Sequence, residues 1–217
     1  YIKRMALDLF RTQRRGGKGI TGASTKDEDP IAHVFTACTH DYIFFFTSRG
    51  QMHWLKVYEI PEASRESRGK AIINLVQVEP GEEVRAMLTV DQPDDPNRYL
   101  VFATHKGIIK KSPLADYSNL RKVSLRAILL EDGDDLMDVQ ISDGSSQIML
   151  ISASARACRF EESQARSMSR GTYGVIGIRL RDPADQAVAL VVTKGAPDEF
   201  LLTISELGMG KRSVFGN

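Results

Sequence analysis

The sequence predicts an all-β fold, a propeller-like disc of four-stranded blades of about 50 residues each. The first observation behind this prediction is an internal repeat, in which an apolar run, a short turn and a second run with a cation follow one another. The copies read YIFFFTSRGQMHWLK (42–56), YLVFATHKGIIKKS (99–112), QIMLISASARACRF (147–160) and FLLTISELGMGKRS (200–213), after a partial copy, YIKRM, at residues 1–5. The turns fall at Gly50, Gly107, Ala155 and Gly208.

The second observation is another half-repeat that alternates with the first. It reads RRGGKGITGA (14–23), SRGKAIINL (67–75), LRKVSLRAI (120–128) and SRGTYGVIGI (169–178). The third is that the apolar runs are short and bounded by Gly, Asp and Ser, as strands are. We therefore expect a single domain over residues 1–217, with about four and a half blade repeats and both ends truncated within a repeat. The alternative is an ordinary β-sandwich, which would not keep the copies in phase.

The composition excludes several classes of protein. The longest apolar runs, YIFFF and VALVV, are far shorter than the roughly 20 residues of a transmembrane helix. The first residues lack the pattern of a secretory signal. The two cysteines, Cys38 and Cys158, are far apart in the sequence. We expect a reduced cytoplasmic protein without a membrane partner, and one long-range disulfide remains open.

The net charge of +1 hides a sorted distribution of charge. Residues 98–126 carry seven cations and one acid, whereas residues 131–143 carry six acids and no cation. Equivalent positions of successive blades lie at equivalent places around a disc, so we expect a belt of cations, separate from the acids, that binds a polyanion such as double-stranded DNA. The alternative is that these are solvated loop charges. The predicted belt comprises Lys3, Arg4, Arg49, Lys56, Arg68, Lys70, Lys106, Lys110, Lys111, Arg121, Lys122, Arg156, Arg159, Arg170, Lys211 and Arg212.

The heptad QRRGGKG at residues 13–19 is the most concentrated cationic segment. Its glycines allow backbone N–H groups to approach phosphate oxygens closely. Arg14 and Arg15 can each fork onto a phosphate, and Lys18 can act as a point charge. The spacing does not match a nucleotide-binding P-loop. No side chain is placed to read a base edge, so we expect backbone contacts with little sequence preference.

With these residues in view, the chain resembles the C-terminal domain of the DNA gyrase A subunit. The heptad matches the signature box of that family, and YIKRM, THDYIFFFTSRG and VYEIPEASRESRGKAIINL extend the resemblance over the whole chain. The resemblance implies a β-pinwheel, a disc, usually of six blades, in which neighbouring blades exchange strands. It also implies right-handed wrapping of DNA around the perimeter, which leads the enzyme to introduce negative supercoils. This activity would depend on the box residues Gln13, Arg14, Arg15, Gly16, Gly17, Lys18 and Gly19.

The same resemblance implies the setting of the domain. The domain would have no catalytic site and no cofactor of its own, but would belong to an ATP-dependent type IIA topoisomerase that uses ATP and Mg²⁺ elsewhere. Its partners would be double-stranded DNA and the remainder of the gyrase A and B subunits in an A2B2 assembly. The isolated domain would be a monomer. We expect it in the cytoplasm, associated with the nucleoid.

Two other functions remain open at this point. One is the topoisomerase IV counterpart, which binds DNA without strong wrapping and lacks an intact box. The other is a non-enzymatic propeller that serves as a platform for protein interaction. The histidines His33, His40, His53 and His105 have no metal-ligand spacing, and the acidic stretch EDGDDLMD (131–138) lacks the spacing of a calcium loop. We therefore expect no metal site.

Overall fold

The computed structural model describes residues 1–10, 31–120, 124–205 and 207–215. The heptad at 13–19 and the belt residues Arg121 and Lys122 lie outside the described residues.

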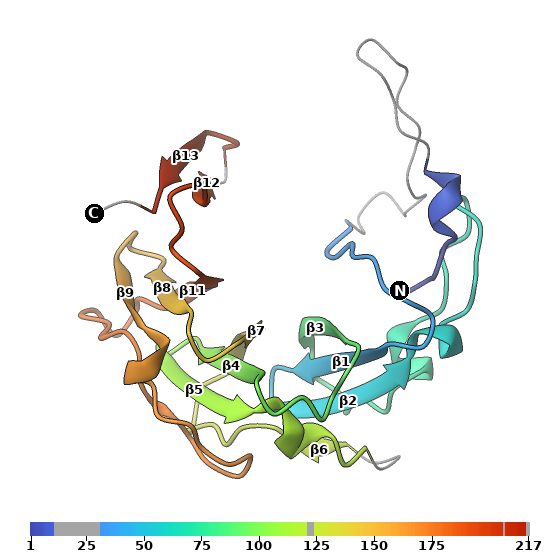
Figure 1. The fold of residues 1–217 in the computed structure, drawn as a ribbon, viewed down its shortest axis with the longest axis horizontal. Coiled ribbons are helices and arrows are strands. Elements are labelled where there is room, and N and C mark those ends of the chain that lie inside the picture. Colours follow the sequence, from blue (N-terminus) through green and yellow to red (C-terminus); the bar gives the residue numbers. More distant parts are fainter. Residues whose placement is uncertain (11–30, 121–123, 206, 216–217) are drawn as a thin grey trace.

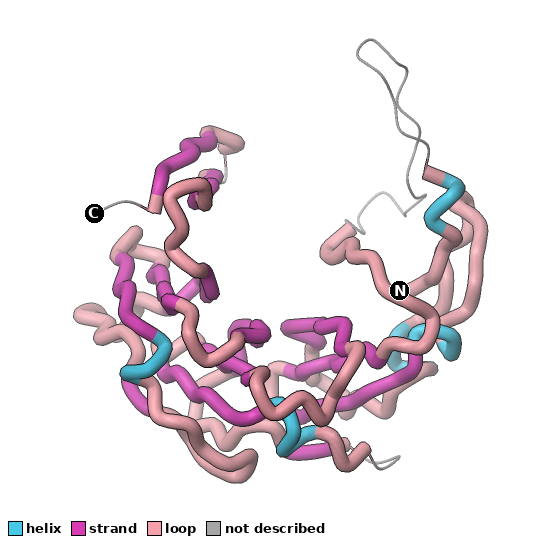
Figure 2. Tube along the Cα trace, in the orientation of Figure 1, coloured by secondary structure: helices cyan, strands magenta, loops and turns pink. Residues whose placement is uncertain are grey.

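Strands and loops make up nearly all of the described chain, with short 3-10 helices between them (Figure 2). The strands are β1 (Tyr42–Thr47), β2 (Gln51–Lys56), β3 (Val84–Val90), β4 (Tyr99–Thr104), β5 (Ile108–Pro113), β6 (Leu125–Arg126), β7 (Leu136–Ser142), β8 (Gln147–Ser152), β9 (Ala157–Glu161), β10 (Val175–Ile176), β11 (Ala187–Thr193), β12 (Phe200–Ile204) and β13 (Gly210–Val214). The 3-10 helices are η1 (Leu7–Leu9), η2 (Val57–Glu59), η3 (Ile72–Asn74), η4 (Leu114–Tyr117) and η5 (Glu162–Gln164).

The strands form small antiparallel sheets, one for each hairpin of the repeat. Their orders are β3-β1-β2-β6, β10-β5-β4-β7, β11-β8-β9 and β12-β13. The short strands β6 and β10 come from the repeat that follows the hairpin they join. The prediction of an all-β β-pinwheel with exchanged strands is therefore confirmed. In Figure 1 the sheets follow one another along an arc, with β3 and β7 on its inner side and β6 on its outer side.

The largest apolar core lies between the first two blades. It joins Phe44 and Phe46 of β1 with Leu100 and Phe102 of β4, and all four side chains are fully buried. The rings of Phe46 and Phe102 meet edge to face, with centroids 5.6 Å apart. Each such side chain contributes about 1.5–3 kcal/mol by leaving water. Because blades cover both faces of β1, its residues 43–47 are all buried and its sequence is a continuous apolar run.

The hairpin turns are also the places where the next repeat docks. Gly107 has φ of 80°, and its carbonyl accepts the N–H groups of Gly177 and Ile178. A Cβ at Gly107 would lie 2.6 Å from the Ile178 carbonyl oxygen, and Gly50 stands in the same relation to Ile128. Only glycine allows both the left-handed backbone and this close approach.

Candidate nucleic-acid interface

The outer strands and hairpin turns present most of the predicted belt to solvent. Lys56 on β2 is half-buried, with its ammonium 3.3 Å from the centre of the Tyr42 ring. Arg159 on β9 and Arg212 on β13 are exposed. The strands β2, β9 and β13 are the second strands of three hairpins along the arc (Figure 1). The exposed belt residues are Arg49, Arg68, Lys70, Lys106, Arg156, Arg159, Lys211 and Arg212; Lys3, Arg4, Lys56 and Arg170 are half-buried.

Two predicted belt residues are not on the surface. The side chain of Lys110 is fully buried, and Lys111 is 7% exposed. The expectation that both cations face solvent is wrong, because the exchanged segment from the next repeat covers β5. An ammonium group in this position can contact the protein but not a duplex outside it.

Lys110 instead links two exchanged segments, the one around Ala127 and the one around Arg170, by hydrogen bonds. Its Nζ donates to the carbonyl of Ala127, at 2.8 Å, and to the carbonyl of Arg170. Tyr117 donates its hydroxyl to the same Ala127 carbonyl. Burial lowers the pKa of Lys110 to about 8. The ammonium supplies the donor for the Arg170 carbonyl, whereas the Ala127 carbonyl also has the Tyr117 hydroxyl.

Lys3 does the same two repeats earlier in the chain. Its Nζ donates to the carbonyls of Ser64, Arg65 and Ser67, at 3.0, 2.8 and 2.6 Å. The Lys3 ammonium donates to the Arg65 carbonyl as the Lys110 ammonium donates to the Arg170 carbonyl. Each of these arginines belongs to a loop that precedes an exchanged segment. Lys3 is thus also held by the fold, although part of its side chain remains accessible.

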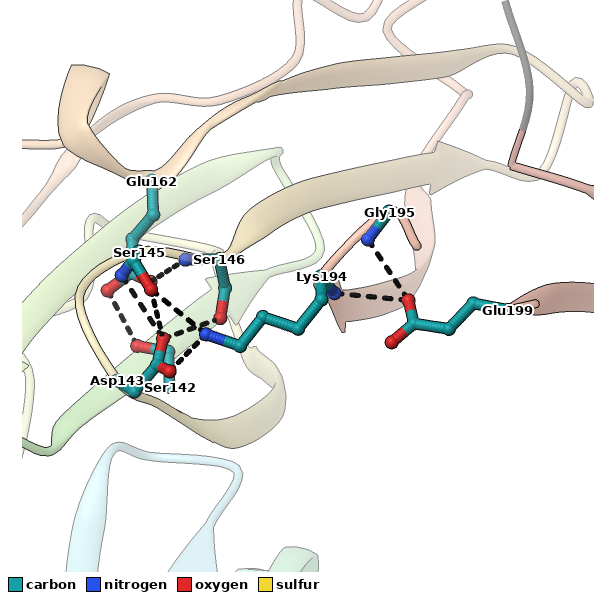
Figure 3. A network of polar contacts seen from close by, with 8 residues as sticks. All are labelled: Ser142, Asp143, Ser145, Ser146, Glu162, Lys194, Gly195 and Glu199. Carbon is teal, nitrogen blue, oxygen red and sulfur yellow. Dashed lines mark hydrogen bonds and ion pairs between the residues drawn. The ribbon is translucent and has the colours of Figure 1, made fainter. Parts of the chain in front are cut away.

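Lys111 pairs with a buried carboxylate. Its Nζ lies 3.8 Å from Glu162 Oε1 and donates to the Glu162 carbonyl. Glu162, fully buried, also accepts hydrogen bonds from the Ser142 hydroxyl and the Ser146 N–H (Figure 3). Buried charges persist only when they are paired and hydrogen-bonded in this way. The pair joins β5 to η5 of the next repeat.

The acidic stretches do not form a zone separate from the cations. Glu82 accepts a hydrogen bond from the Thr47 hydroxyl, and Asp134 accepts one from the Lys106 N–H, so the acids cap the hairpin turns. The ammonium of Lys106 donates to the carbonyl of Asp132 within the same acidic stretch. The turn residues Arg49, Lys106 and Arg156 therefore share one edge of the sheets with acids, and the predicted separation of charges is wrong there.

A second cluster of acids and hydroxyls binds Lys194. Its ammonium contacts Asp143 Oδ2 and the Ser145 hydroxyl, while Glu199 accepts the backbone N–H groups of Lys194 and Gly195 (Figure 3). The hydrogen bond from Lys194 holds the pKa of Asp143 well below its usual range. These contacts join the loop after β7 to the loop after β11 and have no feature of a catalytic centre.

The structure exposes cations that the repeat pattern did not single out. Arg166 follows η5, Arg126 ends β6, and Arg179 follows β10; all three are exposed. They were missed because they do not occupy the recurring arginine position of the half-repeat. That position is held by Arg170, whose side chain is half-buried near Lys110. The signal that could have found Arg166 is the absence of any acid between residues 165 and 174.

Over the described ranges, no three His, Cys, Asp or Glu side chains gather as a set of metal ligands. The same ranges contain no helix with the length and apolar character needed to cross a bilayer.

Strand exchange, left-handed hairpin turns and exposed cations along the outer strands together define a β-propeller-like domain of the kind found in type IIA topoisomerases. The sequence profile described as "DNA gyrase C-terminal domain, beta-propeller" matches residues 1–38, 41–91, 98–143 and 146–194. The chain belongs to this family.

Curated relatives agree with the profile. The DNA gyrase A subunit of Haloquadratum walsbyi is 43% identical over 216 residues, which is 98% of this chain and 25% of the relative. Its Escherichia coli counterpart is 41% identical over 214 residues, 99% of this chain and 24% of the relative. The chain thus spans about a quarter of the length of these proteins.

Solved structures share the fold of the chain. A DNA gyrase A C-terminal domain superposes with a TM-score of 0.76 at 27% identity, over 98% of this chain and 67% of that one. A topoisomerase IV C-terminal domain gives a TM-score of 0.78 at 25% identity, over 98% and 64%. The fold alone therefore does not separate the two enzymes, whereas the curated relatives above are gyrase A subunits and do not favour the topoisomerase IV alternative.

Proposed function

We propose that this chain is the DNA-binding and DNA-wrapping module of a DNA gyrase. The observation that carries the proposal is the set of accessible cations on successive hairpins, such as Lys56, Arg159 and Arg212. Nearly the whole chain that carries them aligns with gyrase A subunits. Duplex DNA carries one charge per ~1.7 Å of its axis, so repeated cations along a curved edge match its backbone.

Wrapping requires many contacts because duplex DNA is stiff. Its persistence length is ~150 bp, and bending a site of 20–30 bp by 40–90° costs on the order of 1–6 kcal/mol. Cations spread over successive blades offset this cost, because each contact with a phosphate adds favourable binding free energy. The heptad at residues 13–19 lies outside the described residues. We assign it the role of fastening one end of the wrap, because its arginines and glycines suit phosphate oxygens.

The proposed module serves a larger enzyme. It has no catalytic site or cofactor of its own, and ATP hydrolysis with Mg²⁺ takes place elsewhere in an assembly of two A and two B subunits. The isolated chain is a monomer, and the enzyme works in the cytoplasm on the nucleoid. All of these statements belong to the proposal, which rests on the similarity of the chain to gyrase A subunits.

The test is topological. The purified chain is incubated with relaxed circular plasmid and a type I topoisomerase, and the linking number of the recovered plasmid is measured. We expect a positive shift for the wild type and none for a variant in which Gln13 to Gly19 are alanine. Duplex binding, measured in parallel, should weaken less than the shift, because the cations outside the heptad remain.

Two outcomes would contradict this proposal in different ways. Duplex binding with no linking-number shift in either protein would favour the topoisomerase IV type of domain, which binds without wrapping. No duplex binding at all would favour a platform for protein interaction.

A further inference from the structure

The loop between η5 and β10 lies on the outer side of the arc (Figure 1). Its residues line a shallow hollow. The hollow measures about 430 Å³, and its lining includes Arg166, Ser167, Ser169, Thr172, Tyr173 and Gly174. One cation, an aromatic ring and three hydroxyl-bearing small residues converge there, with no acid between residues 165 and 174.

The backbone of this loop is fixed to the blade. The Met168 N–H donates to the Lys111 carbonyl at 2.8 Å, and the Leu129 N–H donates to the Thr172 carbonyl at 3.0 Å. Between them, the Arg170 carbonyl accepts the buried ammonium of Lys110. A loop held in this way loses little conformational entropy when a ligand binds.

The side chains of the loop, in contrast, are uncommitted. Over the described part of the chain, no hydrogen bond or ion pair joins the side chains of Arg166, Ser167, Ser169 or Tyr173 to another group. Arg166, Ser167 and Ser169 are exposed, and Tyr173 is 51% exposed. A guanidinium, two hydroxyls and a phenol in a hollow without an acid provide donors for an anion.

The equivalent loop of an earlier repeat is organised differently. Glu62 pairs with Arg4 through a parallel β-bridge, and Ser167 pairs with Lys111 in the same way, so Glu62 and Ser167 are equivalent positions. In the earlier loop Glu62 forms an ion pair with Arg4 at 3.1 Å, and Glu66 adds a second acid. Where the earlier loop has Glu62, the later loop has a serine and a free arginine beside it.

We propose that the hollow at residues 166–174 is a second phosphate-binding seat for duplex DNA, in which Arg166 forks onto a backbone phosphate and Ser167 and Ser169 donate to its oxygens. This inference rests on the proposed DNA-binding function. It adds a fastening point about three blade repeats after the heptad along the chain.

The experiment measures duplex affinity against salt concentration for the 217-residue chain. The test variant is Arg166→Gln, and the matched control is Arg181→Gln, an exposed arginine that stands directly before Asp182 and does not line the hollow. Loss of one phosphate contact makes the negative slope of log K against log salt shallower by about 0.9. If the variant and the wild type bind equally at about 1 M salt, the variant then binds about eightfold more weakly at about 0.1 M. A second variant, Ser167→Ala with Ser169→Ala, should weaken binding with little change in slope.

Three results are distinguishable. A reduced slope for Arg166→Gln, with Arg181→Gln like the wild type, supports the seat. Equal slopes and affinities for all variants, with a wild type that binds duplex, overturn the seat and leave the proposed function standing. A wild type that does not bind duplex overturns both. Since Arg166 is exposed and unpaired, all variants should keep the wild-type unfolding midpoint, which serves as the folding control.

Discussion

The hairpins β4–β5 and β8–β9 occupy equivalent places in successive repeats but have different surroundings. Val101 pairs with Lys111 in the first as Met149 pairs with Arg159 in the second. The outer edge of β5 is covered by β10, whereas among the described residues no strand pairs with the outer edge of β9. Lys111 is accordingly buried against a carboxylate, and Arg159 is exposed. A cation at one repeat position is therefore a structural group or a candidate DNA ligand according to what docks over it.

The turns of these hairpins show the same difference. Gly107 touches the exchanged strand, and a Cβ there would clash with a carbonyl oxygen. Ala155 also has a left-handed backbone, with φ of 60°, but it is exposed. The third turn can therefore carry a methyl group, because it is open to solvent.

The largest expected effect comes from adding a methyl group at the covered turn. Gly107→Ala should lower the free energy of unfolding by about 3 kcal/mol, since it strains a left-handed backbone and pushes Ile178 away. The measurement is chemical denaturation followed by circular dichroism. Gly171→Ala is the control, because a Cβ there would meet no atom within 4 Å. Equal stability of the two variants would show that strand docking does not depend on the turn glycine.

The next effect concerns the covered lysine. Lys110→Met should cost about 2 kcal/mol of stability, because the partly buried Arg170 carbonyl loses its donor. Lys211→Met, at the equivalent position of the exposed hairpin β12–β13, should change stability by less than about 0.5 kcal/mol. The comparison is again made by denaturant titration. A loss in Lys211→Met as large as in Lys110→Met would contradict the distinction between covered and exposed edges.

A smaller effect should appear in the pH dependence of stability. Burial lowers the pKa of Lys110 to about 8, whereas an unfolded lysine titrates near 10.4. Between these values the unfolded chain binds more protons than the folded one, so the free energy of unfolding rises with pH.

This rise should be about 1 kcal/mol per pH unit at most, and it should be absent from Lys110→Met. Denaturation of both proteins at pH 7.5 to 9.5, by steps of about half a unit, isolates the contribution of Lys110 as the difference between them. Tyr117, whose pKa burial raises, is present in both proteins, so its own contribution cancels in the difference. Parallel pH profiles would contradict the assignment of a buried, titrating lysine.

The smallest effect is expected at the exposed turn. Ala155→Gly should raise the free energy of unfolding by about 0.5 kcal/mol at most, because relief of the left-handed strain slightly exceeds the entropy that glycine adds to the unfolded chain. A shift in the midpoint of thermal unfolding would report it. Destabilisation by more than about 1 kcal/mol would show that the methyl group of Ala155 makes a contact that matters.

Much of the fold could be predicted from the repeats. The spacing of Gly50 and Gly107 located two of the hairpins, and the runs around them matched the strands. The half-repeat around Arg170 lies just before the exchanged strand β10. The site was less predictable: Lys110 and Lys111 look like surface cations in the sequence, because nothing local shows that another repeat covers them.

By itself, the sequence determined the period of the repeat, the turns and the cationic character of the outer strands, since these follow from local composition and spacing. Only the tertiary structure decided which cations remain available to a ligand. Lys111 and Arg159 share a register position, but only Lys111 lies in a hairpin, β4–β5, whose edge is paired with an exchanged strand, β10. The loop before β10, which contains Arg166, is at the surface. Burial depends on segments about one repeat apart in the chain, and no local pattern contains that information.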